Sequence, residues 1–139
     1  MYLDTSVAVK LYIPEPDSAE CEAIAGVDGF ISSELLYGEM YAAVFGKERR
    51  GHISAESGKL ILARFESDLS EGQIRLVKIN GPVVRDAVEI MQQVRSDVLL
   101  RTLDAIHLAT YLSVDAGSLF TRDKRMLVAA NKLGLSLAG

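Results

Sequence analysis

The feature that most restricts the fold of this chain is the alternation of short apolar segments with longer segments of helical periodicity. β-Branched and aromatic residues gather in short runs, which we expect to be strands at 1–3, 29–32, 74–79, 118–121 and 135–137. Strands that alternate with helices form a parallel sheet, because each return to the sheet needs a crossover. We therefore expect a three-layer α/β/α sandwich around a parallel sheet.

Between the expected strands, apolar residues recur every three or four positions, as they do along one face of a helix. Ser32 or Ser33 can cap a long helix that Gly51 stops, Pro82 can open another, and Thr102 can cap the next. The expected helices cover 7–12, 18–26, 33–50, 54–69, 82–94, 103–114 and 123–133.

The composition fits a single domain over residues 1–139, since 49% of the residues are hydrophobic and can supply one core. No apolar run approaches the ~18 residues that cross a membrane. Asp4 interrupts the apolar start, so we expect no secretory signal. Cys21 is the only cysteine, so no internal disulfide can form and a cytoplasmic location is expected.

The net charge of −4 counts against a nucleic-acid-binding function, because such proteins usually carry basic surfaces. That objection weakens if several carboxylates bind metal ions, since bound cations invert the local field. Basic residues are grouped at Lys47, Arg49 and Arg50, and again around residues 122–125. Such groups are either solvated helix faces or contacts for a phosphate backbone.

Four acidic residues have surroundings unlike those of a solvated helix. Asp4 and Asp123 directly follow expected strands, and ligands of a parallel sheet bind beyond the carboxyl ends of its strands. Asp104 begins an apolar helix, and Glu39 lies among small residues of the long helix. Alternatively, the aspartates are only helix caps and Glu39 is exposed.

Carboxylates that gather without balancing bases repel one another and need cations to be buried at low cost. No Lys or Arg is adjacent to Asp4 in the sequence, although Arg101, Arg122 and Lys124 could pair with the other carboxylates. Oxygen ligands favour Mg²⁺ or Mn²⁺, and the two histidines and one cysteine have no zinc spacing. We therefore expect Mg²⁺, with Mn²⁺ as a substitute.

Four segments, in this order and spacing, resemble the PIN domain and, more narrowly, the VapC-type ribonuclease toxins of toxin–antitoxin pairs. They are Tyr2-Leu3-Asp4-Thr5-Ser6, Glu39-Met40-Tyr41-Ala42-Ala43, Leu100-Arg101-Thr102-Leu103-Asp104-Ala105-Ile106-His107-Leu108-Ala109 and Phe120-Thr121-Arg122-Asp123. The resemblance covers essentially the whole chain. It implies a central five-stranded parallel sheet, which agrees with the strands expected from the pattern.

The resemblance implies that Asp4, Glu39, Asp104 and Asp123 form an acidic, metal-binding quartet. A hydroxyl of Thr5, Ser6 or Thr121 is implied to assist. Glu34 is a rival to Glu39, because it also follows a strand closely. Glu39 is preferred for the small residues after it.

The resemblance further implies an endoribonuclease toxin of a type II system, inhibited by a cognate antitoxin and dimeric with a second copy. A metal-activated water would hydrolyse the RNA phosphodiester bond, leaving 5′-phosphate and 3′-hydroxyl ends. The candidates to hold the RNA backbone are Arg101, Arg122, Lys124 and Arg125.

His107 lies three residues after Asp104 and can share its helix face. It is either a general base or a residue packed or hydrogen-bonded near the site, and the second is favoured because a metal-bound hydroxide needs no histidine base. Two other functions remain open: a Mg²⁺-binding phosphotransfer or phosphatase-like domain, and an inactive binding module. Aspartate-nucleophile phosphatases have a second Asp two residues after the first, where this chain has Ser6.

Overall fold

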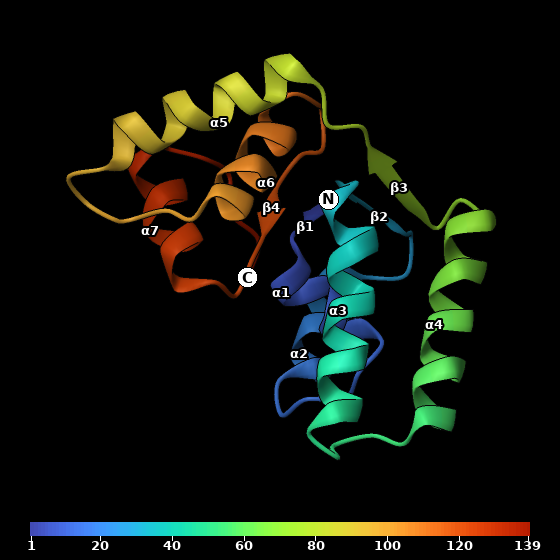
Figure 1. Ribbon diagram of the computed structural model, residues 1–139. Coiled ribbons are helices and arrows are strands. Elements are labelled where there is room, and N and C mark those ends of the chain that lie inside the picture. Colours follow the sequence, from blue (N-terminus) through green and yellow to red (C-terminus); the bar gives the residue numbers. More distant parts are fainter.

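A computed structural model describes residues 1–139 and contains one parallel sheet of four strands. The strands are β1 (Tyr2–Leu3), β2 (Phe30–Ser33), β3 (Ile74–Val77) and β4 (Leu119–Phe120), and their order in the sheet is β3-β2-β1-β4. Because all pairs are parallel, the carboxyl ends of the strands meet at one edge. The expectation of a parallel α/β sandwich is confirmed (Figure 1).

The prediction of five strands was wrong. Residues 135–137 form only an isolated parallel bridge between Leu119 and Leu137. The backbone N–H of Leu119 donates to the carbonyl oxygen of Ser136 (2.8 Å), and the N–H of Ala138 donates to the carbonyl oxygen of Leu119 (2.9 Å). Since β4 is itself two residues long, it offers the last segment too little edge for a ladder.

The helices follow the predicted boundaries closely. They are α1 (Thr5–Ala8), continued by a 3₁₀ turn (Val9–Leu11), α2 (Ser18–Ala25), α3 (Leu35–Arg49), α4 (Ala55–Ser70), α5 (Gly81–Val94), α6 (Thr102–Leu112) and α7 (Lys124–Lys132). The first helix starts two residues earlier than expected, because the Asp4 side chain accepts a hydrogen bond from the N–H of Val7 and caps it. No helix has the length and apolar character needed to span a membrane.

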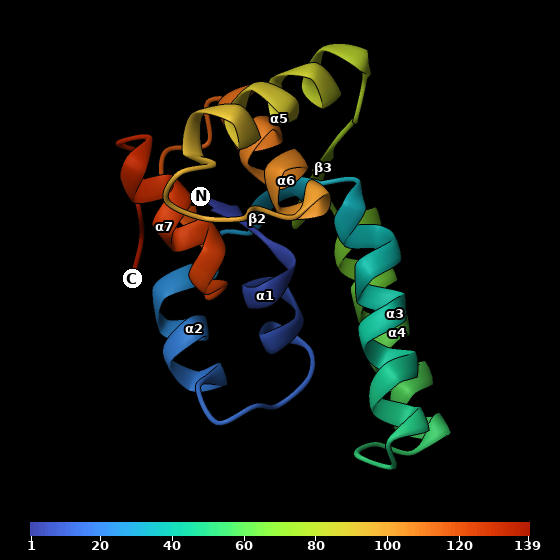
Figure 2. The ribbon, with the colours of Figure 1, turned by 60° about the vertical axis from the view of Figure 1, so that its left-hand side comes forward.

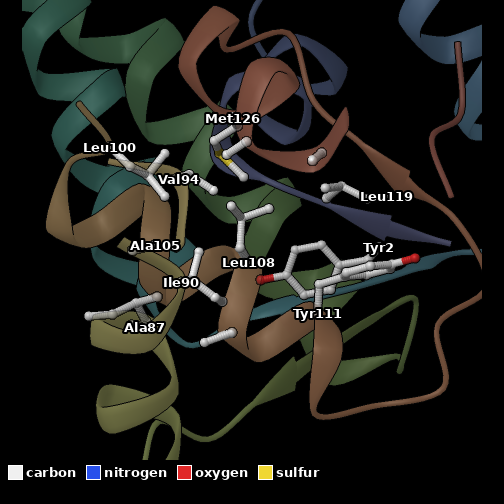
Figure 3. Close-up of a cluster of buried hydrophobic side chains, with 14 of the residues drawn as sticks. Tyr2, Ala87, Ile90, Val94, Leu100, Ala105, Leu108, Tyr111, Leu119 and Met126 are labelled. Carbon is white, nitrogen blue, oxygen red and sulfur yellow. The ribbon is translucent and has the colours of Figure 1, made fainter. Parts of the chain in front are cut away.

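The core consists of two clusters on opposite faces of the sheet, because successive strand residues point to opposite sides. Tyr2 and Leu119 face α5, α6 and α7, and Figure 3 shows their cluster with Leu108 and Met126. Leu3 and Phe120 belong to the other cluster, which is built with α1 to α4. These two layers hold the strands, and therefore the edge where they end, in a fixed position.

The helices α3 and α4 form an antiparallel pair that extends away from the sheet in both views (Figures 1 and 2). Gly58 of α4 lies against α3, because a Cβ at this position would meet the carboxylate of Glu48 and lie 3.2 Å from a methyl group of Val44. The first turns of α3 lie nearest the sheet, so Glu39 is carried on the part of the helix beside the strand ends.

Candidate functional site

The predicted acidic residues come from four different elements around the carboxyl ends of β1 and β4. Asp4 follows β1, Asp123 follows β4, Asp104 lies in the first turn of α6, and Glu39 lies in α3. The structure arranges them as two pairs with different partners.

Asp4 is the most buried of these carboxylates, with 3% of its surface exposed. One oxygen accepts hydrogen bonds from the Ser6 hydroxyl (2.7 Å) and the Val7 N–H (3.3 Å), and the other accepts from the Thr121 hydroxyl (2.8 Å). Burial raises the pKa of Asp4 above its ordinary value, although the hydroxyl donors oppose this shift. Asp4 forms no ion pair with any Lys or Arg, and its hydrogen-bond donors are two hydroxyls and one backbone N–H.

Glu39 is linked to α6 through His107. Its Oε2 atom lies 2.9 Å from Nε2 of His107 and also accepts a hydrogen bond from the Thr5 hydroxyl. Burial acts to raise the pKa of Glu39, but the hydrogen bonds from His107 and Thr5 outweigh it and leave the pKa below its ordinary value. We call Asp4 and Glu39 the inner pair.

Asp104 and Asp123 share a cation, Arg101. The guanidinium donates to Asp104 through Nε (3.0 Å) and to Asp123 through Nη2 (3.0 Å). The other oxygen of Asp123 caps α7 by accepting from the N–H groups of Arg125 (2.8 Å) and Met126 (3.1 Å). The side chains of these two aspartates, which we call the outer pair, keep 16% and 21% of their surfaces exposed.

The hydroxyls predicted to assist the site have separate tasks. Ser6 accepts from the N–H of Arg122 (2.8 Å), and Thr121 accepts from the N–H of Asp123 (3.0 Å), while each donates to Asp4. Both therefore tie the β4–α7 connection to Asp4. Only Thr5 donates to the second carboxylate of the inner pair.

A shallow pocket of about 280 Å³ opens beside these groups and is lined by Glu39, Arg101, Thr102, Leu103 and Asp104. No three acidic, histidine or cysteine side chains converge here as a ready metal-binding group. Arg101 accounts for this in the outer pair, since both aspartates are turned toward its guanidinium. The donors themselves are carboxylate and hydroxyl oxygens, which suit a hard divalent cation.

Glu34, the rival to Glu39, lies elsewhere. It precedes α3, and its carboxylate accepts a hydrogen bond from the N–H of Ile79 (2.9 Å) in the segment between β3 and α5. Glu34 therefore joins two connections of the fold and does not line the pocket.

The basic candidates also differ from one another. Arg122 binds Glu20 (2.6 Å), lies 3.8 Å from Asp17 and covers the ring of Phe120, so it fastens α2 to the end of β4. Lys124 and Arg125 are exposed and form no ion pair. Only these two of the four basic candidates are free of carboxylate partners.

Of the bases that could pair with the carboxylates other than Asp4, only Arg101 does so, since it binds both Asp104 and Asp123. Sequence reasoning missed one participant, because the Tyr2 hydroxyl reaches His107 across 105 residues. Tyr2 has the sequence signature of a core residue only, because it lies in an apolar strand. His107 was expected to be packed or hydrogen-bonded near the site, and it is buried with 3% exposure.

Comparison with known proteins gives matches both in sequence and in structure. A sequence model of the PIN domain matches residues 1–132. The ribonuclease VapC46 of Mycobacterium tuberculosis is 35% identical over 140 aligned positions, covering 99% of this chain and 95% of the relative.

Two solved structures share the fold. VapC20 of Mycobacterium tuberculosis, described as a toxin that cleaves the sarcin–ricin loop, superposes with a TM-score of 0.68 at 14% identity, covering 92% of this chain and 93% of that chain. A toxin–antitoxin complex from Klebsiella pneumoniae contains a chain with a TM-score of 0.62 at 15% identity, covering 94% and 92%. At such low sequence identities, these two structures show only that the fold is shared.

Proposed function

The chain belongs to the PIN domain family, and on that premise we propose that it is a metal-dependent endoribonuclease of the VapC type, the toxin of a type II toxin–antitoxin pair. The observation that carries the proposal is the placement of Asp4, Glu39, Asp104 and Asp123 around one edge of the sheet. The 35% identical relative, which is named a ribonuclease, supports the same activity.

The inner and outer pairs are proposed to hold Mg²⁺, with Mn²⁺ as a substitute. Their oxygen donors fit such an ion, and the buried charge of Asp4 has no cation of the protein near it. When bound, the metal supplies activation of a water and stabilisation of charge on the phosphate. The fit requires Arg101 to release at least one carboxylate of the outer pair.

The residues of the chain prepare the site for this chemistry. Ser6 and Thr121 fix both oxygens of Asp4, and Thr5 fixes Glu39, so the carboxylates are held before substrate arrives. Lys124 and Arg125, exposed beside Asp123, are placed to contact the phosphate backbone, and Arg101 is placed to do so once released. This gives a locally basic rim on an acidic protein.

We further propose that a cognate antitoxin protein inhibits the chain and that two copies form a homodimer in the cytoplasm. The structural neighbour described as a toxin–antitoxin complex supports the first of these. Size-exclusion chromatography with light scattering, with and without a co-expressed antitoxin, tests both.

The activity is tested by incubating total RNA with wild-type protein and with Asp4→Asn, each with Mg²⁺ and with a chelator. We expect cleavage by the wild type in Mg²⁺ only. The products should carry 5′-phosphate and 3′-hydroxyl ends, because a water and not the ribose 2′-hydroxyl is the attacking group. Asp86→Asn, an exposed carboxylate on α5, is the matched control and should cleave like the wild type.

Equal cleavage by wild type and Asp4→Asn would refute the assignment of the site. A 2′,3′-cyclic phosphate product would refute direct attack by water. Metal binding without any cleavage of RNA would instead favour the binding-module alternative.

A further inference from the structure

A hydrogen-bonded chain connects the interior of the protein to Glu39. It starts at the Tyr2 hydroxyl, passes through the imidazole of His107 and ends at Oε2 of Glu39, with both heavy-atom distances at 2.9 Å. Tyr2 is fully buried in β1, and its ring packs edge-on against Tyr111 at 5.7 Å between centroids (Figure 3). This hydrogen-bonded chain is therefore anchored in the hydrophobic core.

The direction of the hydrogen bond at Glu39 follows from the chemistry of its members. An ionised carboxylate can only accept, so Nε2 of His107 carries a proton and donates it to Oε2. The other ring nitrogen, Nδ1, is held by the Tyr2 hydroxyl, which fixes the plane of the ring from the side of the core.

This arrangement leaves His107 unsuited to abstract a proton from substrate. Both ring nitrogens have protein partners, and the side chain is 3% exposed. A general base must come within hydrogen-bond reach of the proton it takes, and no nitrogen of this ring is available for that. The ring instead determines which oxygen of Glu39 is engaged: Oε2 binds His107 and Thr5, while Oε1 has no hydrogen-bond partner.

We propose that Tyr2 and His107 are positioning residues, which hold Glu39 so that its Oε1 oxygen is directed to a divalent cation. The inference rests on the proposed metal-dependent function and assigns to it two residues outside the carboxylate quartet. Groups that orient metal-binding carboxylates typically change metal affinity by about 10–100-fold when removed, even though they never touch the metal.

The experiment is titration calorimetry of Mn²⁺ into the full-length protein without RNA, comparing two amides at position 107. In His107→Gln the amide reaches the place of Nε2 and still donates to Glu39. In His107→Asn the shorter amide reaches the place of Nδ1 and cannot. Both variants lose the same ring, so a purely structural role of His107 affects them alike.

We expect His107→Gln to bind Mn²⁺ within about threefold of the wild type and His107→Asn to bind it about tenfold more weakly. Tyr2→Phe keeps the packing against Tyr111 and removes only the hydroxyl that contacts Nδ1, so a smaller loss of about threefold is expected. Independently of any metal, Tyr2→Phe should change the ¹⁵N shift of Nδ1 of His107, because it removes the hydrogen-bond partner of that nitrogen.

A double variant tests whether the effect passes through Glu39. In a Glu39→Ala background, His107→Asn should have no further effect on Mn²⁺ affinity, because the group it positions is gone. Equal affinities of His107→Gln and His107→Asn, or an additive loss in the double variant, would overturn the inference. If the wild type itself binds no Mn²⁺, the proposed metal-dependent function fails too, which separates that outcome from the others.

Discussion

The inner and outer carboxylate pairs hold their negative charge in opposite ways. Asp4 is buried and surrounded by neutral hydroxyl and amide donors, and Glu39 is held by Thr5 and His107. The outer pair, Asp104 and Asp123, is partly exposed and shares the guanidinium of Arg101. The inner pair is thus fixed in place without a Lys or Arg partner, whereas the two carboxylates of the outer pair share the single positive charge of an exposed side chain.

This difference matters because burying an unpaired carboxylate is costly, while an exposed ion pair contributes little. Binding of a cation is therefore expected to stabilise the inner pair more than the outer pair. The outer pair supplies oxygens that become available only when Arg101 moves. The comparison predicts that equal chemical changes in the two pairs have unequal effects.

The largest effect is expected when a single carboxylate is neutralised in each pair. Asp4→Asn should weaken Mn²⁺ binding by more than about 100-fold, and Asp104→Asn by only about tenfold, because the second change also loosens Arg101. Calorimetry on both variants measures this. Equal losses would mean that the two pairs are equivalent.

Arg101→Gln should act in the opposite direction and tighten Mn²⁺ binding about threefold, because it removes a competing cation from Asp104 and Asp123. Arg125→Gln is the matched control: it removes the same charge near Asp123 but breaks no ion pair. If both variants tighten binding equally, the cause is the general field and not the contact made by Arg101.

The inner pair should also be visible in the stability of the metal-free protein. Since burial raises the pKa of Asp4, its protonated form favours the folded state, and that contribution is lost as pH rises from the unfolded value near 4 through the folded pKa. In chelator, the free energy of unfolding of the wild type relative to Asp4→Asn should therefore fall between pH 4 and pH 7. Urea unfolding at both pH values measures it.

The control for that comparison is Asp86→Asn, whose carboxylate is exposed on α5. The difference between this variant and the wild type should stay constant over the same range. A pH-independent difference for Asp4→Asn as well would contradict the description of Asp4 as a buried, uncompensated charge.

The smallest effect is expected at the rim of the outer pair. Lys124→Glu should weaken RNA binding at low salt and lower the slope of log affinity against log salt by about 1, with an unchanged melting temperature. Lys59→Glu, an exposed change on α4, carries the same charge difference and should leave the slope unchanged. Equal slopes for all three proteins would remove Lys124 from the RNA-binding surface.

The sequence was sufficient to place Asp4 and Asp123 at the edge of the sheet, because both follow apolar strands and precede helices. The two interpretations weighed for them coexist: each caps a helix, and each stands at the edge where the strands end. The strand predicted at residues 135–137 does not form, because its neighbour β4 has only two residues with which it could pair.

Partnerships across the fold could not be predicted from local pattern. In the sequence, Arg101 is simply the residue before a predicted helix. Only the packing of α6 beside α7 brings its side chain to Asp123. Arg122 follows a strand and was expected at the RNA backbone, yet it forms ion pairs with Asp17 and Glu20 of the α2 region. Side chains with long reach choose partners that depend on tertiary geometry, so sequence position alone does not fix their role.

The strand order has a consequence for synthesis of the chain on the ribosome. The strand made first, β1, lies between β2 and β4, and the Tyr2 N–H donates to Ser118 while the Asp4 N–H donates to Phe120. Of the four strands, β1 is translated first and β4 last, so a nascent chain cannot complete the sheet or give Asp4 its Thr121 partner until residues 119–121 have emerged. The carboxylate edge of the sheet is therefore among the last parts of this fold to form during synthesis.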